Sequence, residues 1–425
     1  MPQTQQQPEA QELSESSRDW LESRPAGSRK RLGQYMTPKP VARALLDGLP
    51  VRPGMRVLDP GAGTGELLRA VCEREPAAEL TGWDVDRSAL DAAARLVPEA
   101  TLLCRSALEP DRGGPGYDLV VGNPPYFQLR PTPDQRRRFA GVISGRANIF
   151  AFFFKAGLDA LRPGGRLAYI VPPSMNSGAY FERLREHLVE RARITRLTVL
   201  EGSSRFEGAN TAVQLLVLQK RAGPAGTART TDAGHGTEPF VFERHSAGTG
   251  FHRVLFTEQP ERLARQFEER RTLWQLGYRA GTGTIVWNQH REQLSDRPGP
   301  GTVRLFWSHD LGPAAERPPG LGRRKPGYVS GCEPRFGPAL LVNRVVGAVG
   351  RGELRTAFVG PGEPYLAENH VNVISLRDDA GGPPAIGWAA LRESLESPGA
   401  IERVRSLTGN TQISASELTH LLPLA

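Results

Sequence analysis

Between residues 33 and 220, two spacings of apolar residues alternate along the chain. Short continuous apolar runs are typical of buried strands, and apolar residues that recur every three or four positions are typical of helices. Strands that alternate with helices form a parallel sheet covered on both faces, so this part is predicted to have an α/β fold. Strands are expected at 55–58, 80–84, 119–122, 167–171, 195–200 and 212–218, and helices at 67–72, 88–96, 149–161 and 181–191.

The pattern changes at residues 221–238, which are rich in Gly, Ala, Thr and Pro. Such a composition is typical of an exposed linker. Beyond it, short apolar stretches are separated by many Gly and Pro residues, which predicts a mixed, loop-rich second domain. The predicted organisation is a disordered or frayed arm over 1–32, an α/β domain over 33–222, a linker over 223–245 and a second domain over 246–425.

Charge and composition narrow the class of protein. The 425 residues carry a formal net charge of +8, and only five of the basic residues are lysines. Arginine suits bidentate contacts with phosphate and guanine, so the charge is a weak indication of a nucleic-acid partner. No apolar run is long enough to span a membrane, the first residues have no signal-peptide core, and three scattered cysteines fit a reducing compartment. We therefore expect a cytoplasmic protein with no membrane partner.

A glycine-rich loop, Asp59–Gly65, lies between the first predicted strand and its helix. Its Gly-x-Gly-x-Gly spacing differs from the dinucleotide fingerprint, and no Gly-Lys-Ser/Thr follows, which excludes a P-loop. Asp59 suits an ammonium group better than a pyrophosphate, and Asp84, at the end of the second strand, is placed to hold ribose hydroxyls. A ligand with a ribose and an ammonium but no phosphate is S-adenosylmethionine. The alternative is a glycine-rich turn that only aids packing.

Four residues, Asn123-Pro124-Pro125-Tyr126, follow a predicted buried strand. The two prolines restrict the backbone and bias the residue before each away from helix. The Asn carbonyl can accept a hydrogen bond from an amino group, and the Tyr ring can stack on a planar substrate. The tetrad therefore suits chemistry on an exocyclic or amide nitrogen, although a proline turn that ends a strand explains it equally well.

The order of these motifs resembles the gamma class of DNA adenine-N6 methyltransferases, the Taq-type enzymes of type II restriction–modification systems. The resemblance implies a Rossmann-like methyltransferase sheet over 33–222 and a DNA target-recognition domain over 246–425. It rests on the motifs Gly33–Pro38, Asp59–Gly65, Asp84, Asn123–Tyr126, Asn148–Phe150 and Pro163–Gly165, and in the second half on Val286–His290, Leu305–Trp307, Leu341–Arg344, Asn369–Asn372 and Gly409–Gln412.

The resemblance also implies roles for individual residues. Asn123 and the Pro124 carbonyl accept hydrogen bonds from the target amino group, and Tyr126 stacks on an adenine flipped out of the duplex, with Phe206 on its other side. The cofactor is S-adenosylmethionine, and its predicted contacts are Thr37, Asp59, Gly61, Gly63, Gly65, Asp84 and Ser106. Ser106 departs from the family, which usually has an acid there, so one charged hydrogen-bond acceptor is missing.

The implied chemistry needs no metal and no covalent enzyme intermediate. Two carbonyls that accept both N–H hydrogens make the amino nitrogen more nucleophilic, and the target base has to leave the duplex. The expected partner is double-stranded DNA, bound by a monomer, and a separately encoded cognate endonuclease is a candidate partner.

Four other functions are alternatives. Glutamine methyltransferases that act on release factors also use Asn-Pro-Pro-Tyr, and RNA methyltransferases are a further class. Residues 290–355, with 11 Arg or Lys and 6 Asp or Glu (11 − 6 = +5), and the large second domain favour DNA. A third alternative is a combined restriction–modification enzyme with its own nuclease. Metal-dependent nucleases of that kind usually have an acid two residues before a lysine. None of the five lysines here follows an acid at that spacing, so we expect no nuclease in this chain. A non-enzymatic specificity subunit is the last alternative, and the intact loop and tetrad argue against it.

Overall fold

The computed structural model describes residues 13–24, 35–110, 116–145, 147–200, 213–223, 239–246, 251–312, 325–344, 347–348, 351–408 and 412–425. The chain divides into two compact units. The first comprises Met1–Asn176 and Tyr180–Pro260, and the second comprises Ser177–Ala179 and Glu261–Ala425. No helix in the described ranges is long and apolar enough to cross a membrane.

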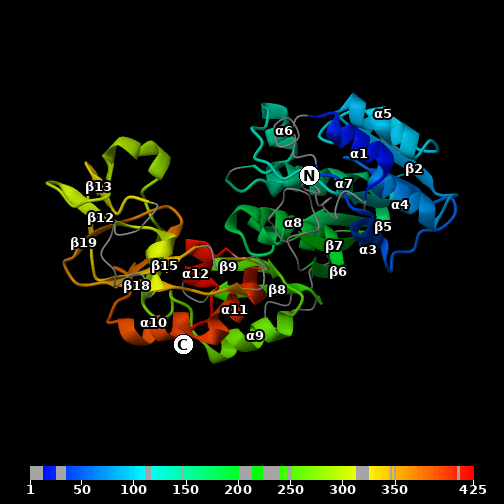
Figure 1. Cartoon of the computed structure of the whole chain (residues 1–425). Coiled ribbons are helices and arrows are strands. Elements are labelled where there is room, and N and C mark those ends of the chain that lie inside the picture. Colours follow the sequence, from blue (N-terminus) through cyan, green and yellow to red (C-terminus); the bar gives the residue numbers. More distant parts are fainter. Residues whose placement is uncertain are drawn as a thin grey trace. The chain divides into compact units, whose positions relative to one another are not determined.

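The first unit is built on a seven-stranded sheet with the order β3-β2-β1-β4-β5-β7-β6 (Figure 1). Neighbouring strands from β3 to β5 pair in parallel, whereas β7 pairs antiparallel with both β5 and β6. The strands are β1 (Arg56–Asp59), β2 (Glu79–Asp84), β3 (Thr101–Cys104), β4 (Tyr117–Gly122), β5 (Leu161–Val171), β6 (Ala192–Leu200) and β7 (Val213–Lys220). The predicted α/β, Rossmann-like fold is confirmed, except that the sheet is not parallel throughout. The exception is β7, which runs antiparallel to both of its neighbours, β5 and β6.

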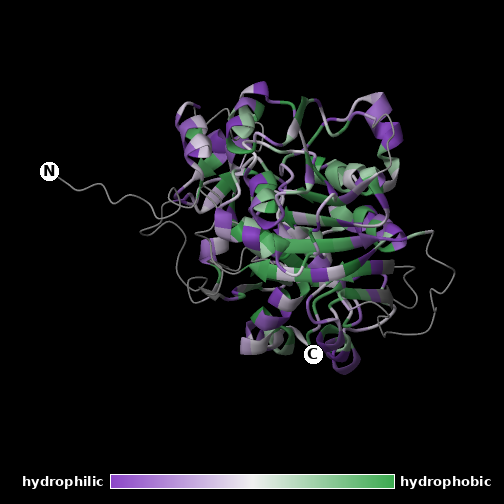
Figure 2. Cartoon of the chain, turned by 90° about the vertical axis from the view of Figure 1, so that its right-hand side faces the viewer, coloured by the Kyte–Doolittle hydropathy of each residue, from purple (hydrophilic) through white to green (hydrophobic). Residues whose placement is uncertain are grey.

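Side chains that alternate along the central strands supply two separate cores. In β4, Val120 packs into one core, while Leu119 and Val121 pack into the other. This alternation follows from the two-residue period of a strand and explains why the strands read as continuous apolar runs. In Figure 2 the central strands are accordingly coloured mainly as hydrophobic. The first core holds α7 (Ile149–Ala160) and α8 (Glu182–Arg191), and the second holds α3 (Lys39–Leu46) and α4 (Glu66–Arg74).

Part of the predicted N-terminal arm is a helix. Within 1–32, residues Glu15–Glu22 form α1, which begins at Ser14, whose side chain accepts a hydrogen bond from the Ser17 amide. Trp20 is buried against α5 (Arg87–Leu96). A serine cap and one large aromatic residue are a weak signal in a stretch of polar residues, which is why the sequence led us to expect a frayed arm.

The hairpin of β8 (Val241–Ser246) and β9 (Phe251–Phe256) spans the end of the predicted linker and the start of the predicted second domain. It belongs to the first compact unit. The hydrophobic residues Val241, Val254 and Phe256 join the core that holds α7 and α8. The alternation of apolar residues in this hairpin is short and directly follows a Gly-rich segment, so the sequence did not reveal these two strands.

The second unit is mixed, as predicted. A four-stranded sheet has the order β10-β20-β15-β18, and a five-stranded sheet has the order β11-β13-β12-β19-β14. The strands are β10 (Tyr278–Thr282), β11 (Leu294–Ser295), β12 (Thr302–Phe306), β13 (Tyr328–Ser330), β14 (Arg335–Phe336), β15 (Ala339–Asn343), β18 (Thr356–Val359), β19 (Pro364–Ala367) and β20 (Val371–Leu376). The helices are α9 (Pro260–Glu269), α10 (Trp388–Glu396), α11 (Pro398–Thr408) and α12 (Ala415–His420).

Candidate functional site

Three predicted polar residues meet at one edge of the first sheet. Asp59 ends β1, Asp84 ends β2, and Asn123 follows β4. Because β2, β1 and β4 are parallel neighbours, their carboxyl ends lie side by side. This edge is where open α/β sheets bind ligands.

The glycine loop is fixed by the two carboxylates. The Gly61 amide donates to Asp59 Oδ1 at 3.0 Å, and the Gly63 amide donates to Asp84 Oδ2 at 2.8 Å. Gly65, at the start of α4, has φ of 89°, and a Cβ there would lie 3.1 Å from the Ala93 Cβ. Two of the predicted glycines, Gly63 and Gly65, therefore occupy backbone conformations that other residues rarely adopt.

Burial of the carboxylates perturbs their ionisation. Burial raises the pKa of Asp59 from 3.8 to about 7, the hydrogen bond from the Gly61 amide opposes this change, and the negative charge of Asp84 adds to it. Burial likewise raises the pKa of Asp84, against the hydrogen bonds from the Asp86 and Gly63 amides. Two buried acids that repel each other form a favourable site for a cation, such as the ammonium group of an amino-acid moiety.

The amide of Asn123 has a defined orientation. Its Nδ2 donates to the Tyr35 carbonyl oxygen and to Thr37 Oγ1, both at 3.2 Å. Both donated hydrogens are therefore satisfied by protein, and Oδ1 is the atom left to accept from a substrate. The resemblance assigns Thr37 to the cofactor, and the structure places its hydroxyl beside the amide of Asn123.

Tyr126 lies beside the same amide. Its hydroxyl is 2.8 Å from both Asn123 Oδ1 and the Ile170 carbonyl oxygen, and its one hydrogen can be donated to either. The ring contacts Phe150 edge to face, with 6.2 Å between the ring centroids. Burial raises the pKa of Tyr126 well above its ordinary value, so the hydroxyl stays a donor. Pro124 is buried and Pro125 is half-buried. Phe206, predicted to face Tyr126, lies outside the described residues.

Ser106 has a structural contact of its own. Its hydroxyl accepts a hydrogen bond from the Leu108 amide at 3.1 Å and so stabilises the turn that follows β3. A carboxylate at this position makes the same turn contact, because Ser and Asp share this local hydrogen bond. Serine therefore preserves the backbone of the loop and lacks only the charge.

Two features beside these residues did not emerge from the sequence. Val85, between Asp84 and Asp86, exposes 63% of its surface, although it is apolar and directly follows β2. The Tyr35 backbone carbonyl orients Asn123, and no side-chain pattern reveals a backbone acceptor. The available signal for Val85 was an apolar residue between two acids directly after a strand. Among the described residues, no group of three or more His, Cys, Asp or Glu side chains is arranged to hold a metal ion.

Comparison with known proteins agrees with this geometry. Residues 85–206 match the family described as Eco57I restriction-modification methylase. Over 169 residues, 38% of the chain, the sequence is 28% identical to the modification methylase CviBIII of Paramecium bursaria Chlorella virus NC1A, with 43% of that protein covered. Over 251 residues, 56% of the chain, it is 28% identical to the type II methyltransferase M.TthHB8I of Thermus thermophilus, with 53% of that protein covered.

A methyltransferase subunit of a type I restriction-modification system from Streptococcus thermophilus overlaps 60% of the chain and 56% of its own, with 18% identity and a TM-score of 0.39. Residues 85–206 are thus similar to restriction-modification methylases of the Eco57I type, which agrees with the predicted resemblance and with S-adenosylmethionine as the cofactor that it implies. The chain spans about half the length of the two curated relatives.

Proposed function

We propose that the chain is a site-specific DNA methyltransferase, which transfers a methyl group from S-adenosylmethionine to the N6 amino group of adenine in duplex DNA. The observation that carries the proposal is the orientation of Asn123, whose Nδ2 donates to Tyr35 and Thr37. Its Oδ1 lies 2.8 Å from the Tyr126 hydroxyl and has a second lone pair with which to accept from a substrate. This acceptor lies at the same sheet edge as the buried pair Asp59 and Asp84.

The chain's own residues account for the reaction in simple terms. S-adenosylmethionine supplies an electrophilic methyl group when bound. Asn123 Oδ1 and the Pro124 carbonyl oxygen accept the two amino hydrogens, which withdraws the nitrogen lone pair from the ring and directs it at the methyl carbon. The gain comes from orientation and from fixed dipoles, since both acceptors are held before the substrate arrives.

The target base has to leave the double helix to reach this acceptor. Base flipping costs a few kcal/mol, and stacking on an aromatic side chain returns about 1–3 kcal/mol per base. Tyr126 is the proposed platform on one side, with Phe206 on the other. Asn123 Oδ1 has two lone pairs, so it can accept a hydrogen bond from the substrate while the Tyr126 hydroxyl donates either to it or to the Ile170 carbonyl oxygen.

The second unit is proposed to read the DNA sequence. Trp287 exposes 42% of its surface, and the Arg291 guanidinium lies 5.0 Å from its ring centroid. An exposed aromatic–arginine pair is suited to contact bases or phosphates. We further propose that the protein acts on DNA as a monomer, and that a separately encoded endonuclease cleaves the unmodified sites.

A label-transfer assay tests the proposal against the two alternatives. The full-length protein is incubated with methyl-labelled S-adenosylmethionine and with duplex DNA, RNA or a release factor in separate reactions. We expect label in the DNA, at adenine N6. Label confined to RNA or to a glutamine side chain contradicts the proposal, because the tetrad alone also accepts an amide nitrogen.

Substitution of Ser106 tests the missing acid. We expect Ser106→Asp to tighten binding of S-adenosylmethionine by about three- to tenfold, because a carboxylate is a stronger acceptor than a hydroxyl and keeps the turn contact with Leu108. Isothermal titration calorimetry measures the change. Ser106→Ala is the matched control and is expected to weaken binding. Equal affinity in all three proteins refutes a role for this position in cofactor binding.

A further inference from the structure

The α1 segment, residues 13–24, packs within the first unit beside α5 (Figure 1). Trp20 is only 5% exposed and packs against Ala89 and Ala92. A helix of eight residues is not stable by itself in water, so these tertiary contacts hold it in place. Neither the family resemblance nor the proposed chemistry assigns this segment a role.

One set of contacts joins the α1 segment to the glycine loop. The Ser17 hydroxyl lies 2.6 Å from the Thr64 hydroxyl, and both side chains are buried. The Ser14 amide donates to Glu66 Oε1 at 2.8 Å, and the Ser14 hydroxyl donates to the same atom. Thr64 and Glu66 flank Gly65, the residue with the positive φ at the start of α4. The α1 segment therefore restrains the loop on both sides of its most unusual backbone position.

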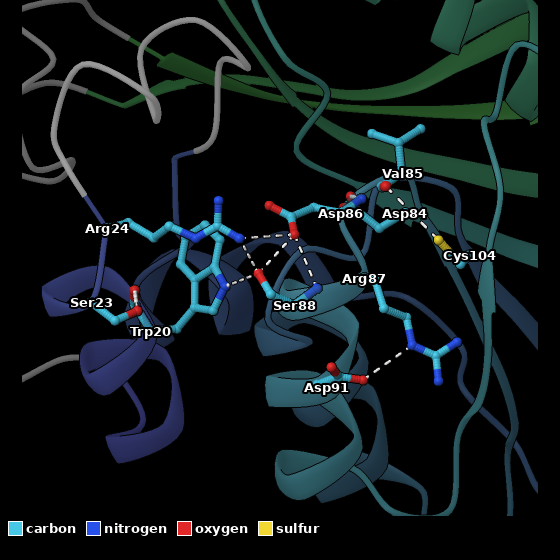
Figure 3. Close-up of polar contacts among 10 residues, drawn as sticks. All are labelled: Trp20, Ser23, Arg24, Asp84, Val85, Asp86, Arg87, Ser88, Asp91 and Cys104. Atoms are coloured by element: carbon cyan, nitrogen blue, oxygen red, sulfur yellow. Dashed lines mark hydrogen bonds and ion pairs between the residues drawn. The ribbon is translucent and has the colours of Figure 1, made fainter.

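A second set joins the segment to the turn that follows β2. Figure 3 shows Trp20 and Arg24 directed at Ser88 and Asp86. Trp20 Nε1 donates to Ser88 Oγ at 3.0 Å, and Arg24 Nη2 donates to Asp86 Oδ1 at 3.2 Å. The Asp86 amide in turn donates to Asp84 Oδ1 at 2.8 Å. The segment is thus linked through a single residue to the acid proposed to hold the cofactor ribose.

The first set of contacts also leads toward the catalytic amide. The Thr64 hydroxyl donates to Met36 Sδ at 3.0 Å. Met36 precedes Thr37, which accepts the hydrogen bond from Asn123. Ser17, Thr64 and Met36, of which the first two are buried and Met36 is half-buried, therefore connect α1 with the residues beside the proposed methyl-transfer site.

We propose that the α1 segment is a positioning element for cofactor binding, which holds the glycine loop and the turn after β2 in the arrangement that binds S-adenosylmethionine. The inference rests on the proposed function, because it takes this site to be the cofactor site. Its residues act through Thr64, Glu66 and Asp86 and do not touch the reacting atoms. A helix that only stabilises the fold is the competing explanation, and it predicts unchanged affinity in protein that remains folded.

The test compares Ser17→Ala with the unmodified full-length protein at a temperature where both are folded. We expect the Kd for S-adenosylmethionine to rise about five- to tenfold, which corresponds to one buried hydrogen bond, while kcat at saturating cofactor stays within about twofold. Thr64→Val removes the partner hydroxyl, and the double variant is expected to bind no more weakly than either single variant. Asp19→Ala, on the exposed side of the same helix, is the matched control and is expected to leave Kd unchanged.

Hydrogen exchange on the cofactor-free protein gives an independent readout. In Trp20→Ala we expect faster exchange of backbone amides in residues 61–66 and 84–88, with no change in the strands of the sheet. Unchanged exchange there, or a Kd for Ser17→Ala within about twofold of the unmodified protein, overturns the inference. If the unmodified protein fails to bind S-adenosylmethionine, the proposed function is refuted, and the exchange measurement still decides whether α1 restrains the loop.

Discussion

Replacement of Asn123 by Ala is expected to lower the rate of methyl transfer by about 10²- to 10³-fold, the usual effect of removing one preorganised polar group from an active site. The affinity for S-adenosylmethionine is expected to stay within about threefold, because Asn123 contacts Tyr35 and Thr37 and not the acids of the cofactor site. Single-turnover methylation of duplex DNA measures the first quantity, and calorimetry measures the second.

Two controls make this result specific. Gln128→Ala removes an exposed amide from the loop that follows the tetrad and is expected to leave the rate unchanged. Asn123→Asp keeps an acceptor but places a second oxygen opposite the Tyr35 carbonyl, so repulsion is expected to misorient the group and to lower the rate as well. Persistence of methylation at a comparable rate in folded Asn123→Ala protein refutes the assignment of Asn123 as the acceptor.

The sequence placed Asp59, Asp84 and Asn123 at the ends of strands, and the topology of the sheet explains why they lie near one another. Asp59, Asp84 and Asn123 each follow a short apolar run, and parallel strands place their carboxyl ends at one edge. Each of these residues can therefore be located from its own strand alone.

The contacts between these residues were not predictable in the same way. Asn123 is oriented by Tyr35 and Thr37, which lie 88 and 86 positions away in the chain. Ser17 reaches Thr64 across 47 positions. Such pairs depend on how the helices pack, and no local period reports them. The direction of β7 escaped prediction for a related reason, since an isolated apolar run does not reveal whether its partner strand is parallel.

The buried acids lead to the second expected result, a cofactor affinity that depends on pH. Burial disfavours the charge of Asp59 and raises its pKa in the folded protein from the ordinary 3.8 to about 7. Folded protein therefore holds more protons than unfolded protein between these two values, and its free energy of unfolding decreases as the pH rises from about 4 to about 7. An ammonium group beside Asp59 favours the ionised carboxylate, so binding of S-adenosylmethionine below pH 7 releases the proton that Asp59 holds. The Kd is expected to fall with rising pH, by up to about tenfold per unit, and to level off above about pH 7.

The charge of Asp59 affects both the affinity for S-adenosylmethionine and the stability of the fold, and Asp59→Asn separates these two effects. Above about pH 7 the variant is expected to bind S-adenosylmethionine about 10- to 100-fold more weakly, since an amide replaces a carboxylate as partner of the ammonium. The cofactor-free variant is expected to gain stability relative to the unmodified protein at the same pH, because it no longer buries a negative charge beside Asp84. Calorimetry in two buffers of different ionisation enthalpy counts the released protons, and thermal unfolding gives the stability.

Asp91→Asn, which replaces an exposed acid on α5, is the control and is expected to change neither the cofactor affinity nor the stability. A Kd of the unmodified protein that is constant from about pH 5.5 to about pH 8 rules out Asp59 as the titrating partner of the ammonium, because a carboxyl that ionises in this range cannot bind a cation equally well in both of its states.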